Sequence, residues 1–161
     1  MKSAVLIGMP GSGKTIVGTI VAKKIGYKFY DTDDLIEKKL GIKISEFLTK
    51  NNEEQFRNIE TEIIKSLSNK TNVIISTGGG SVLNLHNFDD YNKRNFIFIY
   101  LKRDISKLPI DSTRPLVKSY DDLVKLFEIR HKYYEKLSNI CINNDSIFNT
   151  TRHVIRALKH K

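Results

Sequence analysis

Eight residues near the N-terminus constrain the fold of this chain more than any other feature. The segment Gly8-Met9-Pro10-Gly11-Ser12-Gly13-Lys14-Thr15 follows the pattern G-x-x-x-x-G-K-[ST]. It lies directly after an apolar run at 4–7 and opens a helix-period segment at 14–25. Glycines let backbone N–H groups turn towards a ligand with no Cβ in the way, and a helix N-terminus adds positive charge. The pattern therefore predicts a strand–loop–helix unit that binds phosphate.

The residue types in this loop indicate which phosphate compound it takes. Lys14 supplies a point charge for β- and γ-phosphates, and Thr15 offers a hydroxyl to Mg²⁺. The alternative is the dinucleotide-binding pattern G-x-G-x-x-G, but Ile16 stands where its third glycine is required. The loop thus favours a nucleoside triphosphate.

Short strand-like runs alternate with longer helix-period segments along the chain. Strands are expected at 4–7, 28–30, 73–77, 96–101 and 140–142, and helices at 14–25, 34–40, 44–48, 53–67, 121–137 and 150–158. Near-continuous apolar strands in this alternation are typical of a parallel sheet covered on both faces, an α/β three-layer sandwich. No linker or repeat divides residues 1–161, so we expect a single domain. The proline-containing stretch 104–119 is interpreted as a lid.

Charge and apolar content limit the partners. The chain has 27 Lys and Arg against 18 Asp and Glu, a net charge of +9, which favours anionic partners. No apolar run approaches the length of a membrane-spanning helix, and the N-terminus is too punctuated for a signal peptide, so we expect a cytoplasmic protein without a membrane partner. Cys141, in an apolar run, is predicted to be a buried small hydrophobe.

Asp31 and Asp33 lie two residues apart at the end of the second expected strand. Alternate residues of a strand share a face, so both carboxylates should point into the crevice where parallel sheets bind ligands. One can hold a metal-bound water while the other orients an attacking hydroxyl and accepts its proton. The alternative is that Asp33 or Asp34 merely caps the next helix. Proximity to the phosphate loop favours the catalytic interpretation.

Gly78-Gly79-Gly80 follows the third expected strand. Three glycines in succession let backbone amides approach a ligand directly, although such a segment can also be a flexible connector. Its place at another strand end favours a ligand contact.

Two arginines, Arg57 and Arg130, have unusual positions for solvated charges, and a third, Arg114, lies in the expected lid. Arg57 flanks an apolar stripe and has Glu60 at i+3, which suits a rigid grip on a carboxylate. Arg130 falls on the apolar face of its helix, where a guanidinium needs a structural or ligand anion unless its head reaches solvent. Arg114 lies in the loop 104–119, where it suits a lid cation for the transition state or is simply solvated. The expected stripe beside Arg57 is Phe56, Ile59, Ile63 and Leu67, and a Ser119–Asp122 capping box opens the helix that carries Arg130.

The order of these motifs resembles the shikimate kinase family. After the phosphate loop come Asp31-Thr32-Asp33, Phe56-Arg57-x-x-Glu60, Gly78-Gly79-Gly80, Arg114-Pro115-Leu116, and Arg130 followed by Tyr134. The resemblance implies transfer of the γ-phosphoryl group of ATP to the 3-hydroxyl of shikimate. It also implies a five-stranded parallel sheet of order 2-3-1-4-5, a closing lid and a monomer.

The resemblance further implies a role for each matching residue. Asp33 would be the base, assisted in catalysis by Lys14 and Arg114, and Mg²⁺ would be held by Thr15 and, through water, by Asp31. ATP would contact Gly11, Ser12, Gly13, Lys14, Thr15, Ile16 and Arg114, and shikimate would contact Asp33, Arg57, Gly79, Gly80 and Arg130. The lid departs from the family pattern: it is shortened and offers only Lys107 where members often carry an arginine that packs on adenine.

Two other functions fit parts of the sequence. A kinase for another polyhydroxy acid, such as gluconate, would share the phosphate loop but is not expected to combine Arg57 and Arg130 around a glycine triplet. A nucleic-acid-binding NTPase would use the basic tail formed by Arg152, Arg156, Lys159 and Lys161. No aromatics alternate with these basic residues to form a stacking surface, so we expect no nucleic-acid partner.

Overall fold

The computed structural model describes residues 1–110, 117 and 119–159. Five strands lie in these residues: β1 (Ser3–Ile7), β2 (Lys28–Asp31), β3 (Val73–Ser76), β4 (Phe96–Lys102) and β5 (Ile140–Asn143). The helices are α1 (Lys14–Ile25), α2 (Thr32–Leu40), α3 (Ile44–Lys50), α4 (Glu53–Leu67), α5 (Asp89–Asn92), α6 (Tyr120–Leu137) and α7 (Ile147–Lys159). Short 3₁₀ turns occupy Ser81–Leu83, Leu85–Phe88 and Ile105–Lys107.

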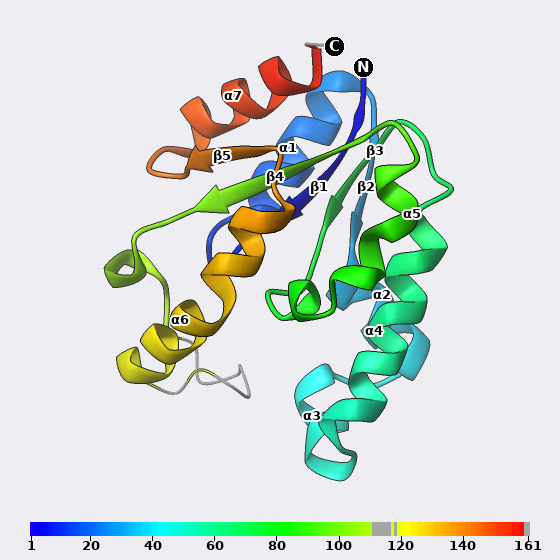
Figure 1. Ribbon diagram of the computed structural model, residues 1–161, viewed down its shortest axis with the longest axis vertical. Coiled ribbons are helices and arrows are strands. Elements are labelled where there is room, and N and C mark those ends of the chain that lie inside the picture. The colour runs from blue at the N-terminus through cyan, green and yellow to red at the C-terminus, as the bar shows by residue number, and fades with distance from the viewer. Residues whose placement is uncertain (111–116, 118, 160–161) are drawn as a thin grey trace.

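The strands form one parallel sheet in the order β2-β3-β1-β4-β5 (Figure 1). The central strand β1 is buried along its whole length, with Val5 paired to Ile75 of β3 and Phe98 of β4. Such a strand needs apolar residues on both faces, which explains the uninterrupted apolar run at its sequence position. The predicted sheet order is confirmed.

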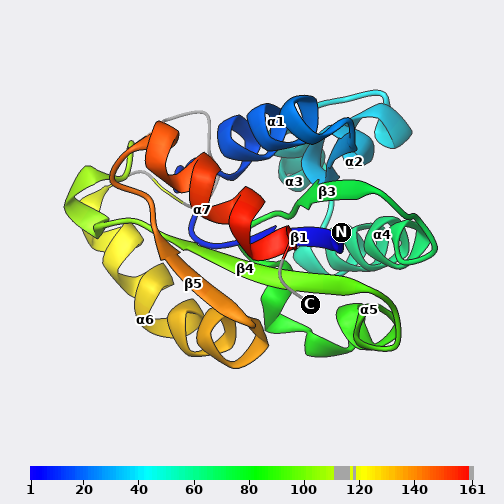
Figure 2. The ribbon, with the colours of Figure 1, turned by 90° about the horizontal axis from the view of Figure 1, so that it is seen from above.

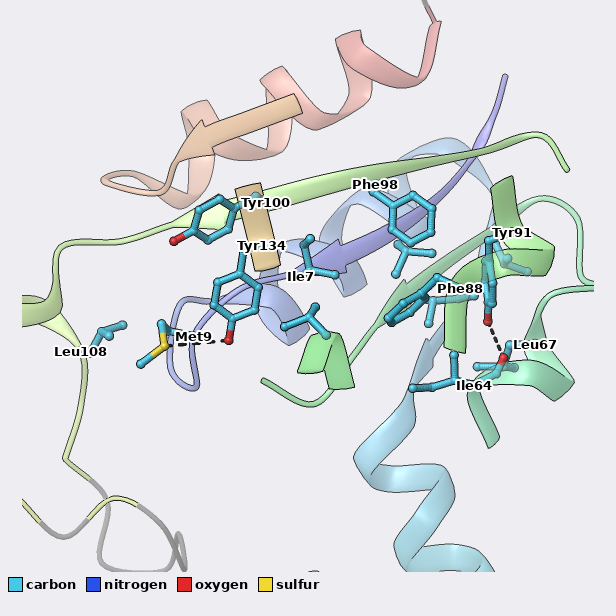
Figure 3. Packing of buried hydrophobic residues seen from close by; sticks show 14 of the residues in the cluster. Ile7, Met9, Ile64, Leu67, Phe88, Tyr91, Phe98, Tyr100, Leu108 and Tyr134 are labelled. Atoms are coloured by element: carbon cyan, nitrogen blue, oxygen red, sulfur yellow. Dashed lines mark hydrogen bonds between the residues drawn. The ribbon is translucent and has the colours of Figure 1, made fainter. Parts of the chain in front are cut away.

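Helices cover both faces of the sheet and enclose two hydrophobic cores (Figure 2). Alternate residues of β1 face opposite sides, so Ala4 and Leu6 pack under α1 and α7, while Val5 and Ile7 face α4, α5 and α6. Aromatic residues fill much of the core on the side of α4, α5 and α6, including Phe88, Tyr91, Phe98, Tyr100 and Tyr134 (Figure 3). The predicted three-layer sandwich is therefore present.

Two helices begin and end at the predicted residues, namely α1 and α4. The prediction for the start of α2 is wrong by two residues, because Asp31 is its N-cap and accepts a hydrogen bond from the Asp33 N–H. Helix α7 begins at Ile147, three residues before the predicted start. The Ser119–Asp122 capping box at the start of α6 is confirmed.

Two predictions about burial are wrong. Cys141 is exposed, because β5 is an edge strand that turns only one face, that of Ile142, towards α7. In α4 the buried row is Phe56, Glu60, Ile64 and Leu67. Ile64 therefore occupies the core position expected for Ile63. Glu60 also lies in the buried row, which the apolar periodicity of the sequence does not predict.

The carboxyl ends of β1, β2 and β3 lie side by side at one edge of the sheet. The phosphate loop follows β1, Asp31 ends β2 and the glycine triplet follows β3 soon after, so the topology brings three separate motifs together. Among the described residues no helix is both long enough and apolar enough to cross a membrane.

Candidate active site

A cavity of about 470 Å³ opens at this edge of the sheet. Every motif that lies in the described residues contributes to its wall: Gly11, Lys14 and Thr15 from the phosphate loop, Asp31 and Asp33 at and after the end of β2, Arg57 and Glu60 from α4, the triplet Gly78–Gly80, and Arg130 from α6. The apolar side chains of Pro10, Ile44, Leu48, Phe56, Val117 and Leu126 also line it. An apolar wall combined with converging polar groups is typical of a small-molecule site.

The phosphate loop is shaped by glycines in left-handed conformations. Gly11 and Gly13 have φ angles of 78° and 94°, and a Cβ at Gly8 would lie 2.6 Å from the Leu101 carbonyl oxygen. The buried Lys14 donates to the carbonyl oxygens of Gly8 and Met9, both at 2.9 Å. Carbonyl groups of the loop thus bind the ammonium group of Lys14, which is also the first residue of α1.

Ser12, Gly13 and Ile16 do not line the cavity. Within the phosphate loop, Ser12 is buried and Gly13 is the N-cap of α1, whereas Ile16 lies beyond the loop on that helix and is 54% exposed.

Asn144, to which the sequence patterns assign no role, supports the phosphate loop. The Asn144 side chain, buried after β5, donates from Nδ2 to the Ser12 carbonyl oxygen at 2.6 Å. A Cβ at Gly13 would collide with the same amide. Ser12 and Asn144 are 132 residues apart in the chain, so no local pattern reveals this contact.

Thr15 and Asp31 meet at the mouth of the loop, where the Thr15 hydroxyl donates to Asp31 Oδ2 at 2.7 Å. The other carboxylate oxygen caps α2 by accepting from the Asp33 N–H at 3.0 Å. Asp31 and Asp33 therefore converge because of a helix cap, not because they alternate along a strand. The expectation of convergence holds, but its predicted geometric cause is wrong.

The pair Thr15 and Asp31 fits Mg²⁺ in its chemistry. Both side chains offer oxygen, the donor that Mg²⁺ prefers, and Mg²⁺ in phosphate sites is usually held by one or two protein oxygens together with water and phosphate. The described residues contain no cluster of three or more His, Cys, Asp or Glu able to bind a metal by themselves. A Mg²⁺ ion bound to these two side chains would take its remaining ligands from phosphate and water.

Asp33 lines the cavity, and although the residue as a whole is exposed, its carboxylate is desolvated by the groups around it. This desolvation, with the charges of Asp31 and Glu60, raises the pKa of Asp33 to about 6, and Lys14 opposes the rise. Gly78 lies so close that a Cβ there would meet Asp33 Oδ1 at 2.9 Å, and the Gly78 N–H donates to the Thr32 hydroxyl. A carboxylate with this pKa is suited to accept a proton near neutral pH.

Arg57 is held between two carboxylates of its own helix. Nη1 donates to Glu60 at 2.6 Å, and Nη2 donates to Glu53 at 3.0 Å. Glu60 is 1% exposed, whereas Glu53 lies at the surface. Burial lowers the pKa of Arg57, but its carboxylate partners outweigh that effect and the net shift is upward. The predicted pairing of Arg57 with Glu60 is confirmed.

Arg130 is buried on the inward face of α6, as predicted, with 3% of its surface exposed. Its Nε is buried and has no hydrogen-bond partner in the described part of the chain. Burial lowers the pKa of Arg130, but the neighbouring Tyr134 hydroxyl and Glu60 favour its charged form. A buried guanidinium that lines a cavity with an unused N–H is suited to bind an anion there. Arg114 lies outside the described residues.

The sheet order, the phosphate loop and the adjoining acceptor cavity define a P-loop kinase that acts on a small molecule. The shikimate kinase family model matches residues 10–159 of the chain. The chain therefore belongs to the shikimate kinase family, whose members are ATP-dependent phosphotransferases.

Individual relatives agree with this assignment. A shikimate kinase of Thermodesulfovibrio yellowstonii is 40% identical over 153 residues, which cover 91% of this chain and 88% of that one. Shikimate kinase from Acinetobacter baumannii, solved in complex with shikimate, superposes with a TM-score of 0.89 at 27% identity and covers 100% of this chain and 96% of its own. The Aquifex aeolicus shikimate kinase structure gives a TM-score of 0.85 at 31% identity, with 98% and 96% covered.

The gluconate alternative has a structural counterpart. A gluconokinase from Sinorhizobium meliloti superposes with a TM-score of 0.65 at 17% identity, covering 98% of this chain and 91% of its own. This likeness shows a shared fold alone, because fold does not determine function.

Proposed function

We propose that this chain transfers the γ-phosphoryl group of ATP to the 3-hydroxyl of shikimate. One observation carries the proposal: Asp33 lies in the same cavity as the phosphate loop, Arg57 and Arg130. This supports the proposal, because a proton acceptor, a triphosphate site and two cations able to bind the carboxylate of an acceptor would then share one cavity.

The phosphate loop would hold the triphosphate through its backbone N–H groups and the N-terminus of α1. Lys14 would exchange the carbonyl oxygens of Gly8 and Met9 for phosphate oxygens. Mg²⁺ held by Thr15 and, through water, by Asp31 would neutralise phosphate charge when bound.

Arg57 and Arg130 would bind the shikimate carboxylate, and the backbone of Gly79 and Gly80 would contact the substrate between them. Ile44, Leu48 and Phe56 would pack against its ring carbons. Asp33 would then accept the proton of the 3-hydroxyl as its oxygen bonds to the γ-phosphorus and the bond from that phosphorus to ADP breaks.

Several finer features remain predictions. These are a single domain over residues 1–161, a lid over 104–119 with Arg114 as its cation, Ile16 at the ATP site, a monomer, the use of Mg²⁺, and action in the cytoplasm without nucleic acid. The basic surplus of the chain suits two anionic substrates, ATP and shikimate.

A coupled assay for ADP release, offering shikimate and gluconate separately, tests the proposal. We expect turnover with shikimate only, and loss of turnover in Lys14→Ala. Turnover with gluconate, or ADP release that does not depend on the acceptor, would contradict it.

A further inference from the structure

Tyr134 lies at the point where three parts of the site meet. It is on α6, one turn beyond Arg130, and its side chain is fully buried. Its ring stacks on Tyr100 with centroids 5.1 Å apart, which fixes the direction of the hydroxyl (Figure 3). Figure 3 shows that hydroxyl pointing away from Tyr100 and towards Met9 of the phosphate loop.

The Tyr134 hydroxyl contacts each of the three parts. It donates to the Gly79 carbonyl oxygen at 2.5 Å and lies 3.8 Å from Met9 Sδ. The Arg130 guanidinium lies beside it, close enough for each group to shift the pKa of the other. A hydroxyl has one proton and two lone pairs, so donation to Gly79 leaves its lone pairs available to the guanidinium.

These contacts constrain both arginines of the site. Arg130 is constrained directly, with its Nε left unused. Arg57 is constrained through the backbone, because the Gly79 carbonyl belongs to the Gly79–Gly80 peptide and Gly80 lies against the Arg57 guanidinium. A planar peptide fixed at its oxygen is fixed at its nitrogen as well.

We propose that Tyr134 is a positioning residue for the acceptor carboxylate, whose hydroxyl holds Arg130 and the Gly79–Gly80 peptide in their binding arrangement before the substrate arrives. This inference rests on the proposed function. Preorganisation of this kind increases affinity because the side chains are not ordered at the moment of binding. Tyr134 takes no part in proton transfer, since burial strongly raises the pKa of its hydroxyl, which stays protonated.

Tyr134→Phe removes the hydroxyl and keeps the stacked ring. We expect the KM for shikimate to rise roughly tenfold to a hundredfold, the range for a lost hydrogen bond to a charged group, with little change in the KM for ATP. Tyr91→Phe is the matched control, because Tyr91 is a buried tyrosine that donates to the Ile64 carbonyl oxygen, also at 2.5 Å, in a part of the core outside the cavity lining (Figure 3). The Tyr91→Phe variant loses the same kind of hydrogen bond but should leave the KM for shikimate unchanged.

A second readout separates positioning from general loosening of the fold. The methyl ester of shikimate lacks the negative charge, so wild type should prefer the acid in kcat/KM. Tyr134→Phe should lose much of this preference, whereas loosening would lower activity on both compounds equally. An unchanged preference in Tyr134→Phe, or the same loss in Tyr91→Phe, would overturn the inference.

Wild-type protein gives a third test, in which a variant serves only to assign a signal. With ¹⁵N-labelled arginine and no substrate, the Arg130 Nε–H signal, assigned by its loss in Arg130→Lys, should be sharp and slow to exchange. An averaged, fast-exchanging signal would refute preorganisation. Failure of wild type to phosphorylate shikimate would instead refute the proposed function itself.

Discussion

The guanidinium of Arg57 lies against the backbone of Gly80, where a Cβ would come 2.6 Å from Nη2 and 2.9 Å from Nη1. The backbone of Gly80, with φ of −93° and ψ of −9°, is open to any L-residue. Gly80 is therefore required by the position of a neighbouring side chain and not by its own conformation. This relationship makes the glycine part of the carboxylate site.

Gly80→Ala should displace Arg57 while leaving the fold intact, because the group in the way is the end of a flexible side chain. We expect the KM for shikimate to rise about tenfold, an effect comparable to one weakened charge-assisted hydrogen bond. The KM for ATP should not change.

A double-mutant cycle with Arg57→Lys checks the cause of that effect. If Gly80→Ala acts through Arg57, the double variant should be little worse than Arg57→Lys alone. Fully additive losses would show that Gly80 acts through another contact.

The two carboxylates that hold Arg57 should differ sharply in importance. Glu60→Gln removes the charge from the buried partner, and we expect a loss of about 1–3 kcal/mol in stability with a raised KM for shikimate. Glu53→Gln changes the surface partner and should cost less than about 1 kcal/mol. Chemical denaturation of both variants beside steady-state kinetics makes the comparison, and equal effects would contradict it.

The pKa of Asp33 predicts the acid limb of the pH–rate profile. Only the carboxylate accepts a proton, so kcat/KM for shikimate should fall as pH drops through about 6. An unperturbed aspartate would place this limb near 4. Asp33→Asn should lack turnover at every pH, whereas Asp34→Asn, at a neighbouring residue outside the cavity lining, should keep it. An acid limb near 4, or turnover in Asp33→Asn, would rule out Asp33 as the base.

The raised pKa of Asp33 also makes stability depend on pH. Deprotonation of Asp33, which activity requires, lowers the stability of the fold. The folded protein holds the Asp33 proton more tightly than the unfolded chain, because the pKa is raised from 3.8 to about 6 by folding. The contribution of this group to stability is therefore present below about pH 4 and is lost as pH rises through 6. Asp33→Asn should raise Tm at pH 7 and change it little at pH 4. Water in the cavity screens the carboxylate and makes the rise in Tm at pH 7 smaller. A lower Tm at pH 7 would contradict this sign.

Local patterns predicted the scaffold well. The strand–loop–helix unit around Lys14 and the bounds of α1 and α4 follow from short-range signals, namely glycine placement, apolar periodicity and caps. The position of Asp33 in the site was also predicted, but for the wrong reason. Two carboxylates two residues apart come together equally well across a strand face or across a helix cap, and spacing alone does not separate these geometries.

Local sequence patterns do not predict contacts between distant segments of the chain. The bond from Tyr134 to Gly79 spans 55 residues, and that from Asn144 to Ser12 spans 132. Each depends on how a late helix or strand packs beside an early loop. The exposure of Cys141 likewise depends on the edge position of β5, which no local apolar run encodes.

Asn144 provides a last prediction, on the side of the nucleotide. Asn144→Ala leaves the Ser12 carbonyl oxygen without the amide that lies 2.6 Å away, and an unsatisfied buried acceptor costs about 1–3 kcal/mol. Because Ser12 belongs to the phosphate loop, part of this cost should appear as a raised KM for ATP, with the KM for shikimate little changed. Asn149→Ala, at an exposed asparagine of α7, is the control and should alter neither value. A loss of stability with an unchanged KM for ATP would show that Asn144 supports the fold without shaping the loop.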